Sequence, residues 1–296
     1  MPEDWQDVVD QADSYRRRAL MLDPLVGTGI IRVVEPHLLE SRLDPLIYET
    51  VMGGFDAYNE GRYEEAFNKL SGLMQLLSGP MMQEHRIDRD SLPDILFWYQ
   101  GLAAAQTNRY GIALMNINQL LQRRLAVEKN DDLVIYAPLH TAELRYLLGV
   151  IQQRHGISSA AENSFKAALT EDLSLYMANV RLADLYEDEG RWEEAVLERR
   201  RATFANPEDP SLLVDLGRTL MAADSAGQAV EVLRRAVELQ PRMVVGYYEL
   251  GRALAARKEQ DEAQEALQHF IRSAPSTMAV QVRAARSLLA DLGSAP

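Results

Sequence analysis

Apolar residues recur along most of the chain at the spacing of an amphipathic α-helix. In residues 211–223 the positions that share this spacing are Leu213, Leu216, Gly217 and Leu220. Residues 226–241 repeat the pattern with Ala229, Val232, Leu233, Ala236 and Val237. Such spacing gathers the apolar side chains on one face of a helix, and no stretch of the sequence alternates for long as a β-strand does. The pattern predicts an all-α protein made of helix pairs.

Small residues mark a period of 34 residues in the second half of the chain. One column of this period contains Gly149, Ala183, Gly217 and Gly251, and a second column, twelve residues later, contains Ala161, Ala195, Ala229 and Ala263. Where two antiparallel helices cross closely, Gly or Ala admits the neighbouring backbone, whereas a larger side chain would force the helices apart. We therefore assign these columns to structural positions inside each hairpin.

Two earlier units follow the same plan with a longer spacing. Gly54 and Ala66 mark the first of them, and Gly101 and Ala113 mark the next. The step from Gly54 to Gly101 is 47 residues and the step from Gly101 to Gly149 is 48, which is 13 or 14 more than the regular unit. Pro and Asp residues in 79–93 and 128–140 indicate that the additional residues lie in these connections.

These columns resemble the tetratricopeptide repeat, a family of 34-residue helix-turn-helix units with Gly or Ala at position 8, Ala at position 20 and a large apolar residue at position 24. Residues 142–275 match the family as four contiguous repeats. The resemblance implies a right-handed α-solenoid of about six helix pairs. One position departs from it, because Arg199 stands at position 24 of the fourth of the six helix pairs, where the other regular repeats have Phe165, Leu233 or Leu267.

The predicted organisation has four parts. They are an N-terminal helical segment with a half repeat (1–46), two long and irregular repeats (47–141), four regular repeats (142–275), and a C-terminal capping helix with its tail (276–296). The half repeat is indicated by Ala12, Ala19 and Pro24, which match columns 20, 27 and 32 of the family. A half repeat at this place is consistent with a chain cut from a longer one.

One motif occurs twice, as Glu60–Ala66 and as Glu189–Ala195, and reads Glu-Gly-Arg-aromatic-Glu-Glu-Ala in both places. Its glycines, Gly61 and Gly190, fall where the first helix of a repeat ends and the backbone turns left-handed. The two Glu residues that follow fall in the first turn of the second helix, where carboxylates meet the positive end of the helix dipole. We interpret the motif as a hairpin turn and not as a catalytic site.

The resemblance further implies that positions 2, 5, 9, 12 and 13 of each first helix line a concave groove for a protein partner. One end of this predicted groove is aromatic and apolar, with Tyr48, Val51, Phe55, Tyr58, Trp98, Leu102, Tyr146 and Val150. The other end is charged, with Asp184, Glu187, Arg218, Tyr248 and Arg252. The Lys and Asn by which related co-chaperones hold a terminal carboxylate are absent, because Val51 and Phe55 stand in their places.

Each end of the groove allows two interpretations. The aromatic end could form an open apolar surface that receives a partner segment, or its residues could fill the space opened by the longer connections or be covered by the same chain. At the charged end, Asp184 and Arg218 lie in neighbouring repeats, and we expect an internal ion pair between them rather than two separate ligand contacts.

Composition and charge exclude several other functions. The formal net charge of −13 repels nucleic acid and anionic lipid. The chain contains no cysteine, and its five histidines do not fall at paired metal-ligand spacing. No phosphate-binding loop or serine elbow is present. We therefore expect no catalytic residue, no metal and no cofactor.

The sequence thus predicts a non-catalytic scaffold or assembly adaptor that binds another protein or peptide segment. The alternatives are a regulatory or substrate-recruiting domain of a larger enzyme, and a structural protein that associates with itself. No signal peptide or transmembrane segment is recognisable. We expect a cytoplasmic protein, with a periplasmic location as the alternative if the chain is a piece of a longer one.

Overall fold

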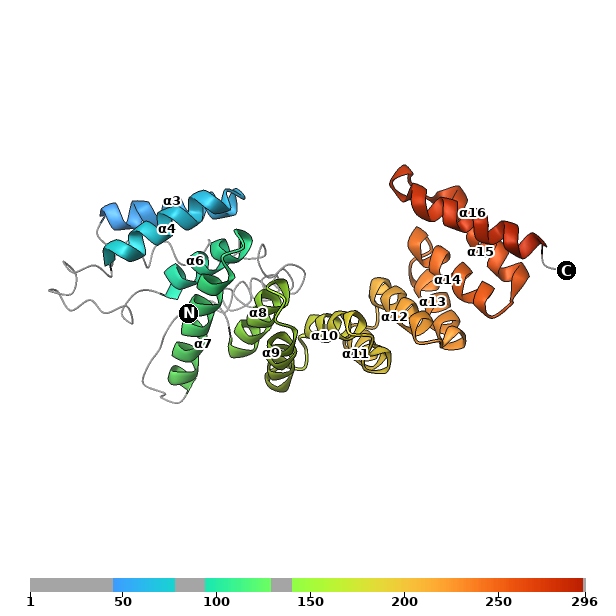
Figure 1. Ribbon diagram of the computed structural model, residues 1–296, viewed down its shortest axis with the longest axis horizontal. Helices are drawn as coiled ribbons and strands as arrows, with labels where there is room; N and C mark the ends of the chain where they lie inside the picture. Colours follow the sequence, from blue (N-terminus) through green and yellow to red (C-terminus); the bar gives the residue numbers. More distant parts are fainter. Residues whose placement is uncertain (1–44, 78–93, 129–139, 295–296) are drawn as a thin grey trace, which may run out of the picture. The chain divides into compact units, whose positions relative to one another are not determined.

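The computed structural model describes residues 45–77, 94–128 and 140–294 (Figure 1). Over these residues the chain has thirteen α-helices, one short 3-10 helix and no β-strand. None of the helices in this described part combines the length and the apolar character needed to cross a membrane. The predicted all-α fold is confirmed. The predicted half repeat and the two long connections fall largely outside the described residues.

The chain divides into two compact units, Met1–Leu175 and Tyr176–Pro296. The described helices of the first unit are α3 (Pro45–Asn59), α4 (Tyr63–Leu77), α6 (Asp94–Gln106), α7 (Tyr110–Glu128), α8 (Thr141–Arg154) and α9 (Ser158–Glu171). They pack as the hairpins α3–α4, α6–α7 and α8–α9, and α4 and α7 each contact the first helix of the next hairpin. At 19 residues, α7 is longer than the other described helices of this unit and accounts for part of the longer spacing of the early repeats.

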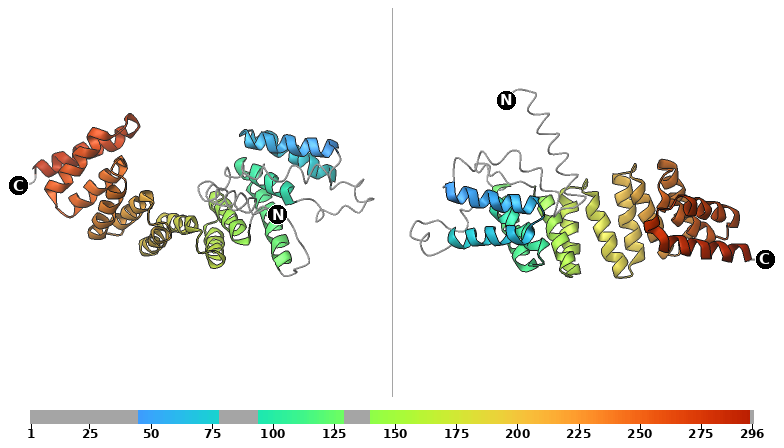
Figure 2. Two further views of the ribbon diagram at one scale, coloured as in Figure 1. Left: turned by 180° about the vertical axis from the view of Figure 1, so that it is seen from behind. Right: turned by 90° about the horizontal axis from the view of Figure 1, so that it is seen from above.

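The second unit continues with α10 (Tyr176–Asp188), α11 (Trp192–Ala205), α12 (Pro210–Ala222), α13 (Ala226–Leu239), α14 (Val244–Ala256), α15 (Gln260–Ser273), the 3-10 helix η3 (Ser276–Met278) and α16 (Ala279–Ser294). The hairpins are α10–α11, α12–α13 and α14–α15, and the two helices of each lie side by side in both views of Figure 2. In addition, α12 contacts α14, so the first helices of these two repeats form one continuous layer.

A contact between residues sixteen positions apart recurs in the hairpins. A Cβ atom added to Gly149 would lie 2.5 Å from Cε1 of Phe165, and one added to Gly217 would lie 2.5 Å from Cγ of Leu233. Gly251 and Leu267 show the same approach at 2.6 Å. The large side chain of each second helix therefore rests directly on the backbone of the first helix. This contact explains the small residues of the first column.

The other small residues are also inside the hairpins. Gly54 and Gly101 approach Leu70 and Ile117, which are again sixteen positions later. The second column is buried at every position, which are Ala66, Ala113, Ala161, Ala195, Ala229 and Ala263. Ala183, the one member of the first column that is not Gly, is buried as well.

The turns inside the hairpins share one backbone conformation. Among the described residues, six have positive φ angles, and each stands seven positions after the small residue of the first column: Gly61, Asn108, Gly156, Gly190, Asp224 and Lys258. The next amide of each turn donates to a carbonyl five residues earlier, as Arg191 N does to Tyr186 O at 2.8 Å. This left-handed end of the first helix is the conformation expected for the Glu-Gly-Arg motif. In both copies the Arg bridges two flanking Glu side chains, as Arg191 does with Glu189 and Glu194.

The last helix, α16, packs against α15 and against the end of the second unit. Ala285 is fully buried there with Leu267 and Phe270, and Val282 and Leu289 lie against the same cluster. Polar residues on the other side of α16, such as Arg283 and Arg286, are exposed. The helix therefore covers the apolar face that α15 would otherwise present to water.

The glycine contact yields a stability prediction. Gly149→Ala should lower the free energy of unfolding by about 1–3 kcal/mol, because the new methyl group would overlap the ring of Phe165, which is fully buried. Gly111→Ala in the same unit is the matched control. Gly111 is an exposed position of α7 with nothing within 4 Å of its added Cβ, so the change should stabilise by up to about 1 kcal/mol. Urea unfolding measures both values, and stabilisation by both substitutions would contradict the packing described.

Candidate functional site

The residues of the predicted aromatic end lie in the core of the first unit. Val51, Phe55, Tyr58, Trp98, Leu102, Tyr146 and Val150 are all buried. Phe55 stacks on Tyr99 of the next hairpin at a centroid distance of 4.2 Å, and the Tyr146 ring lies 5.8 Å from Phe165. The expectation of an open apolar surface is therefore corrected. The side chain of Tyr48 lies outside the described residues.

The physical reason is packing: Phe55 and Tyr58 fill the space between the first two hairpins, whereas Tyr146 packs against Phe165 inside its own hairpin. The contacts α4–α6 and α3–α6 bring the first two hairpins together. Phe55 and Tyr58, both on α3, contact the ring of Tyr99 on α6. Burying these large aromatic rings removes their apolar surface from water and stabilises the junction between the two hairpins. These residues are buried and present no open surface, whereas the longer connections named in the second interpretation lie outside the described residues. These buried residues offer no exposed surface to a partner, so their binding of a partner stays a prediction.

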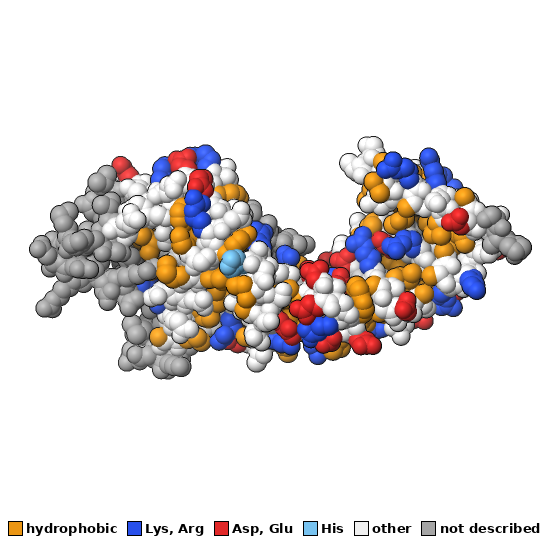
Figure 3. Space-filling model, viewed as in Figure 1, with side chains coloured by type: hydrophobic (Ala, Val, Ile, Leu, Met, Phe, Trp, Pro, Cys, Tyr) orange, Lys and Arg blue, Asp and Glu red, His pale blue; other side chains and the backbone are white. Residues whose placement is uncertain are grey.

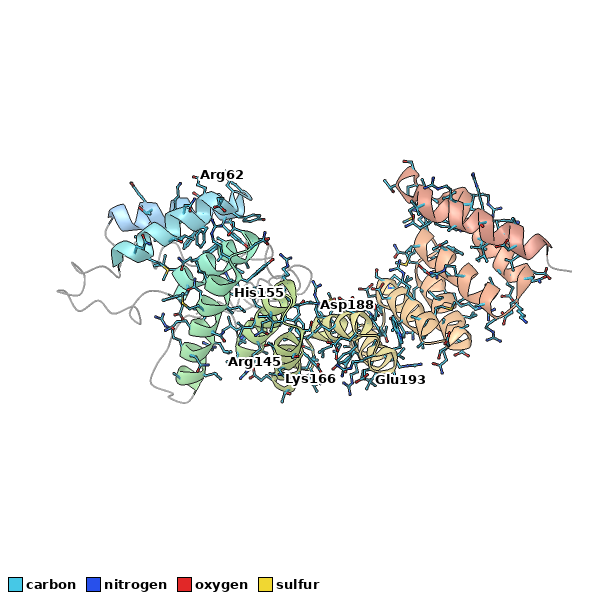
Figure 4. All side chains as sticks on the ribbon, in the orientation of Figure 1. Arg62, Arg145, His155, Lys166, Asp188 and Glu193 are labelled. Carbon is cyan, nitrogen blue, oxygen red and sulfur yellow. The ribbon has the colours of Figure 1, made fainter. Side chains whose placement is uncertain are left out.

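The charged end of the predicted groove has a different character. Asp184 and Glu187 on α10, Arg218 on α12, and Tyr248 and Arg252 on α14 are half-buried or exposed. They belong to the first helices of three consecutive repeats, all in the second unit. Figure 3 shows acidic side chains over α10 and basic ones over α12 to α14 on this face. Figure 4 places Asp188 on this side of the α10–α11 hairpin and Glu193 on the opposite side. We call this face, formed by α10, α12 and α14, the charged face.

Arg199 of α11 holds the acidic part of the charged face. Its side chain is only 7% exposed, and its Nη2 donates to Asp184 Oδ1 at 2.7 Å. Nε and Nη2 also donate to Glu187 Oε1, at 3.1 and 3.0 Å. The hydroxyl of Thr219 on α12 donates to the same Glu187 oxygen at 2.6 Å. A guanidinium from the second helix thus reaches the carboxylates of the first helix, and Thr219 links one of them to the next repeat.

This arrangement explains the departure at repeat position 24. In the other regular repeats the large residue at this position packs on a glycine sixteen residues earlier, but here the pair is Ala183 and Arg199. A buried guanidinium requires charged partners, and Asp184 and Glu187 provide them. Its neighbours in sequence, Arg200 and Arg201, are exposed, so the Arg-Arg-Arg run is one buried side chain and two solvated ones.

The expected ion pair between Asp184 and Arg218 is not the pairing in the structure. Asp184 pairs with Arg199 and, at 3.9 Å, with Arg181 of its own helix. Arg218 instead donates from Nε to Glu249 Oε1 at 2.9 Å, and lies 3.4 Å from Asp215. Arg199, which reaches Asp184 from the second helix of the same hairpin, takes the place expected for Arg218.

Glu249 joins the two arginines of the charged face. Its side chain is 5% exposed, and its second oxygen, Oε2, accepts from Nη1 of Arg252 at 2.8 Å. Arg252 also lies over the ring of Tyr248, with 5.7 Å from its Cζ to the ring centroid. Both carboxylate oxygens of Glu249 are therefore used to hold guanidinium groups from two different repeats.

Sequence reasoning missed Arg199, Asp215 and Glu249 as members of this site. Asp215 and Glu249 are one period of 34 residues apart, and each stands three residues before an arginine of the charged face. This recurring acid–Arg spacing on a helix was a signal that could have identified them. For Arg199 the signal was the break in an otherwise apolar column.

Burial shifts the pKa values of the acidic groups on this face. Desolvation raises the pKa of Asp184 above its ordinary value of 3.8, because it outweighs the attraction of Arg199 and Arg181. Desolvation likewise raises the pKa of Asp215, against the attraction of Arg199 and Arg218. Burial alone would lower the pKa of Arg199, but the surrounding carboxylates of Asp184, Glu187 and Asp215 raise it. The arginine therefore stays charged, while the two aspartates ionise less readily than in water.

The fold of this chain is similar to that of known repeat proteins, although its sequence is not. No family model and no curated protein sequence matches the chain. Among solved structures, it is similar to the C-terminal part of a TPR repeat-containing protein from Cytophaga hutchinsonii, with 14% identity over 82% of this chain and 95% of that one and a TM-score of 0.58. The MamA RS-1 double mutant gives 17% identity over 63% of this chain and 97% of that one, with a TM-score of 0.50. At such low identity, these likenesses show the helical-hairpin fold.

The buried ion pairs predict the effect of removing Arg199. Arg199→Ala should lower the free energy of unfolding by about 2–4 kcal/mol, because Asp184 and Glu187 lose their shared partner. Combining Arg199→Leu and Ala183→Gly with Asp184→Asn and Glu187→Gln should recover most of this loss, since the glycine makes room for the leucine and the pair restores the contact seen in the other regular repeats. Arg200→Ala, on the exposed side of α11, is the control and should change stability by less than about 0.5 kcal/mol. If Arg199→Ala matches this control, the ion pairs do not hold the face.

The raised pKa of Asp215 predicts how stability depends on pH. Because the pKa of Asp215 is higher in the folded chain than in the unfolded chain, the protonated side chain stabilises the folded state. This contribution is fully present below pH 3.8, the ordinary pKa, and is lost as the pH rises through the pKa of the folded chain. Asp215→Asn has no proton to lose there, so the free energy of unfolding of the variant, relative to the native chain, should increase from pH 3.5 to pH 7. Glu231→Gln on the exposed side of α13 controls for net charge. A relative stability that falls or stays constant over this range would contradict the assignment.

Proposed function

Because the chain folds as a tetratricopeptide-repeat solenoid, we propose that it is a non-catalytic interaction scaffold whose charged face binds a segment of another protein. The segment would lie across α10, α12 and α14, the first helices of three consecutive repeats. Solenoids of this kind present one continuous layer of first helices, and here α12 and α14 are in direct contact.

One observation carries the proposal: the polar side chains of the charged face are held in place by buried partners. Arg199 fixes Asp184 and Glu187, and Glu249 fixes Arg218 and Arg252. Side chains that are already ordered lose little conformational freedom when a ligand binds. A surface that served only to keep the protein in solution would not need buried charges beneath it.

The face also has room for a bound chain. Four residues after Arg218 and Arg252, on the same faces of their helices, stand Ala222 and Ala256, and both are exposed. Small side chains at these places leave the helix surface accessible to a backbone. A protein that recruits a substrate to a larger enzyme would use the same surface, because binding is the activity in either case.

A steric block tests the proposal without changing any charge on the face. Dodecapeptides that bind the purified protein would be selected from a random displayed library, and their dissociation constants measured by fluorescence polarisation. Ala222→Trp and Ala256→Trp should each weaken binding by about tenfold or more, because the indole fills the path of the segment. Glu231→Trp, at an exposed position of α13, should leave binding unchanged.

Circular dichroism establishes that each variant is folded. Hydrogen exchange on the saturated complex should show protection concentrated in α10, α12 and α14. Two results would overturn the proposal: equal binding by the blocked and control variants, or a library that contains no binder with a dissociation constant below 1 mM. Protection confined to α11 and α13 would likewise assign the function to the opposite face.

A further inference from the structure

We propose that Arg218 and Arg252, held together by Glu249, form a receptor for a carboxylate side chain of the bound segment. This inference rests on the proposed function and specifies its ligand. The partner is an extended protein segment that passes over α12 and α14 and carries a Glu or Asp at this point.

The geometry concentrates two guanidinium groups at one place. Nε of Arg218 and Nη1 of Arg252 bind different oxygens of the same carboxylate, at 2.9 and 2.8 Å. Two like charges would otherwise repel each other across the gap between the repeats. The buried carboxylate of Glu249 removes this repulsion and fixes the position of both groups before any ligand arrives.

Both arginines still present hydrogen-bond donors to solvent. Their side chains are 50% and 45% exposed, whereas that of Glu249 is 5% exposed. Each guanidinium carries five N–H groups in a planar fork. Within the described part of the chain, Arg218 uses donors toward Glu249 and Asp215, and Arg252 uses one toward Glu249. The remaining N–H groups suit the paired oxygens of a carboxylate.

The local charge favours a carboxylate over a phosphate. Arg218 and Arg252 carry two positive charges, Glu249 offsets one of them, and Asp215, 3.4 Å from Arg218, offsets the other when it is ionised. A ligand carboxylate is therefore held by the unused N–H donors and not by a surplus of charge, and a phosphate dianion would add a further uncompensated negative charge. The net charge of −13 for the whole chain opposes a polyanion further. A single acidic side chain is therefore the ligand that the cluster fits.

The surroundings of the cluster strengthen such a contact. Met221 and Ala255 are half-buried, and Ala222 and Ala256 are small and exposed. An acidic side chain laid against these apolar groups loses part of its water, which strengthens its attraction to the guanidinium groups. By comparison, the carboxylates of Asp184 and Glu187 already accept hydrogen bonds from Arg199 and Thr219. Fewer of their oxygen lone pairs are therefore left for a basic residue of the bound segment.

A double-mutant cycle between protein and peptide tests the inference. The probes are the selected dodecapeptides with N-acetyl and C-amide caps, and versions in which each acidic residue is replaced in turn by Gln or Asn. At least one such replacement should weaken binding to the native protein by about tenfold. The same replacement should change binding to the triple variant Arg218→Gln, Glu249→Gln, Arg252→Gln by less than about twofold.

The triple variant neutralises Glu249 so that no buried charge is left without a partner. If the triple variant does not fold, the single variant Arg252→Gln should still bind the peptide. Replacing the acidic residue of the peptide should then weaken binding by about threefold instead of tenfold. Arg234→Gln with Arg235→Gln, on the exposed side of α13, is the control and should keep the full tenfold effect.

Several outcomes would overturn the inference. The first is that the selected peptides contain no acidic residue. The second is that replacing the acidic residue weakens binding equally for the native protein and the triple variant. The third is that a peptide with phosphoserine in place of the acidic residue binds more than tenfold tighter. Equal binding by an uncapped peptide without acidic side chains would assign the cluster to a chain terminus instead. If Ala222→Trp still blocks binding in any of these cases, the scaffold proposal stands and only the carboxylate receptor fails.

Discussion

The close approach of a large side chain to a small residue sixteen positions earlier determines how each hairpin is built. Where Gly149 faces Phe165, or Gly217 faces Leu233, the two helices pack with no side chain between them on the glycine side. This contact makes a small residue necessary once per repeat and a large one necessary in the following helix. The left-handed turn between them, seven residues after the small position, fixes the direction of the second helix. Hairpins of one shape can then stack on one another.

The same constraint explains why the charged face exists where it does. In the fourth repeat, Arg199 takes the place of the large apolar residue, and its guanidinium requires the carboxylates of Asp184 and Glu187. A position that elsewhere serves only packing thus organises the polar surface of α10. In the next two repeats the packing contact returns, and Glu249 takes over the role of holding charges in place. Two buried ionic groups, one basic and one acidic, support the two parts of the face.

Most of the fold could be predicted from the sequence, because the period of 34 residues is carried by residues with a strict steric role. A glycine pressed against a leucine admits few substitutions, so its column remains visible. The same period places Arg218 and Arg252 at equivalent positions of neighbouring first helices, and their binding of a partner stays a prediction. The ion-pair partners were not found, because a pairing depends on the rotamers of long side chains, and Arg199 reaches its partners across the hairpin from another helix.

The aromatic end shows a second limit of sequence patterns. A face position on a first helix looks the same whether the next hairpin covers it or leaves it open. Phe55 and Trp98 occupy such positions, and only the packing of α3 and α4 against α6 shows that they are inside. Hydrophobicity indicated a surface that could bind, whereas burial shows that the protein itself already uses it.

The central claim, that a partner segment is held by the exposed guanidinium groups of the charged face, can be observed directly by NMR of the arginine Nε–Hε groups. Signals would be assigned through single Arg→Lys substitutions, and a selected acidic peptide would then be titrated into the labelled protein. We predict that the signals of Arg218 and Arg252 shift in proportion to the bound fraction, while that of Arg199, which is buried beneath the face, changes little. Shifts confined to Arg200, Arg234 and Arg235, or no shift in any arginine at saturation, would contradict the claim.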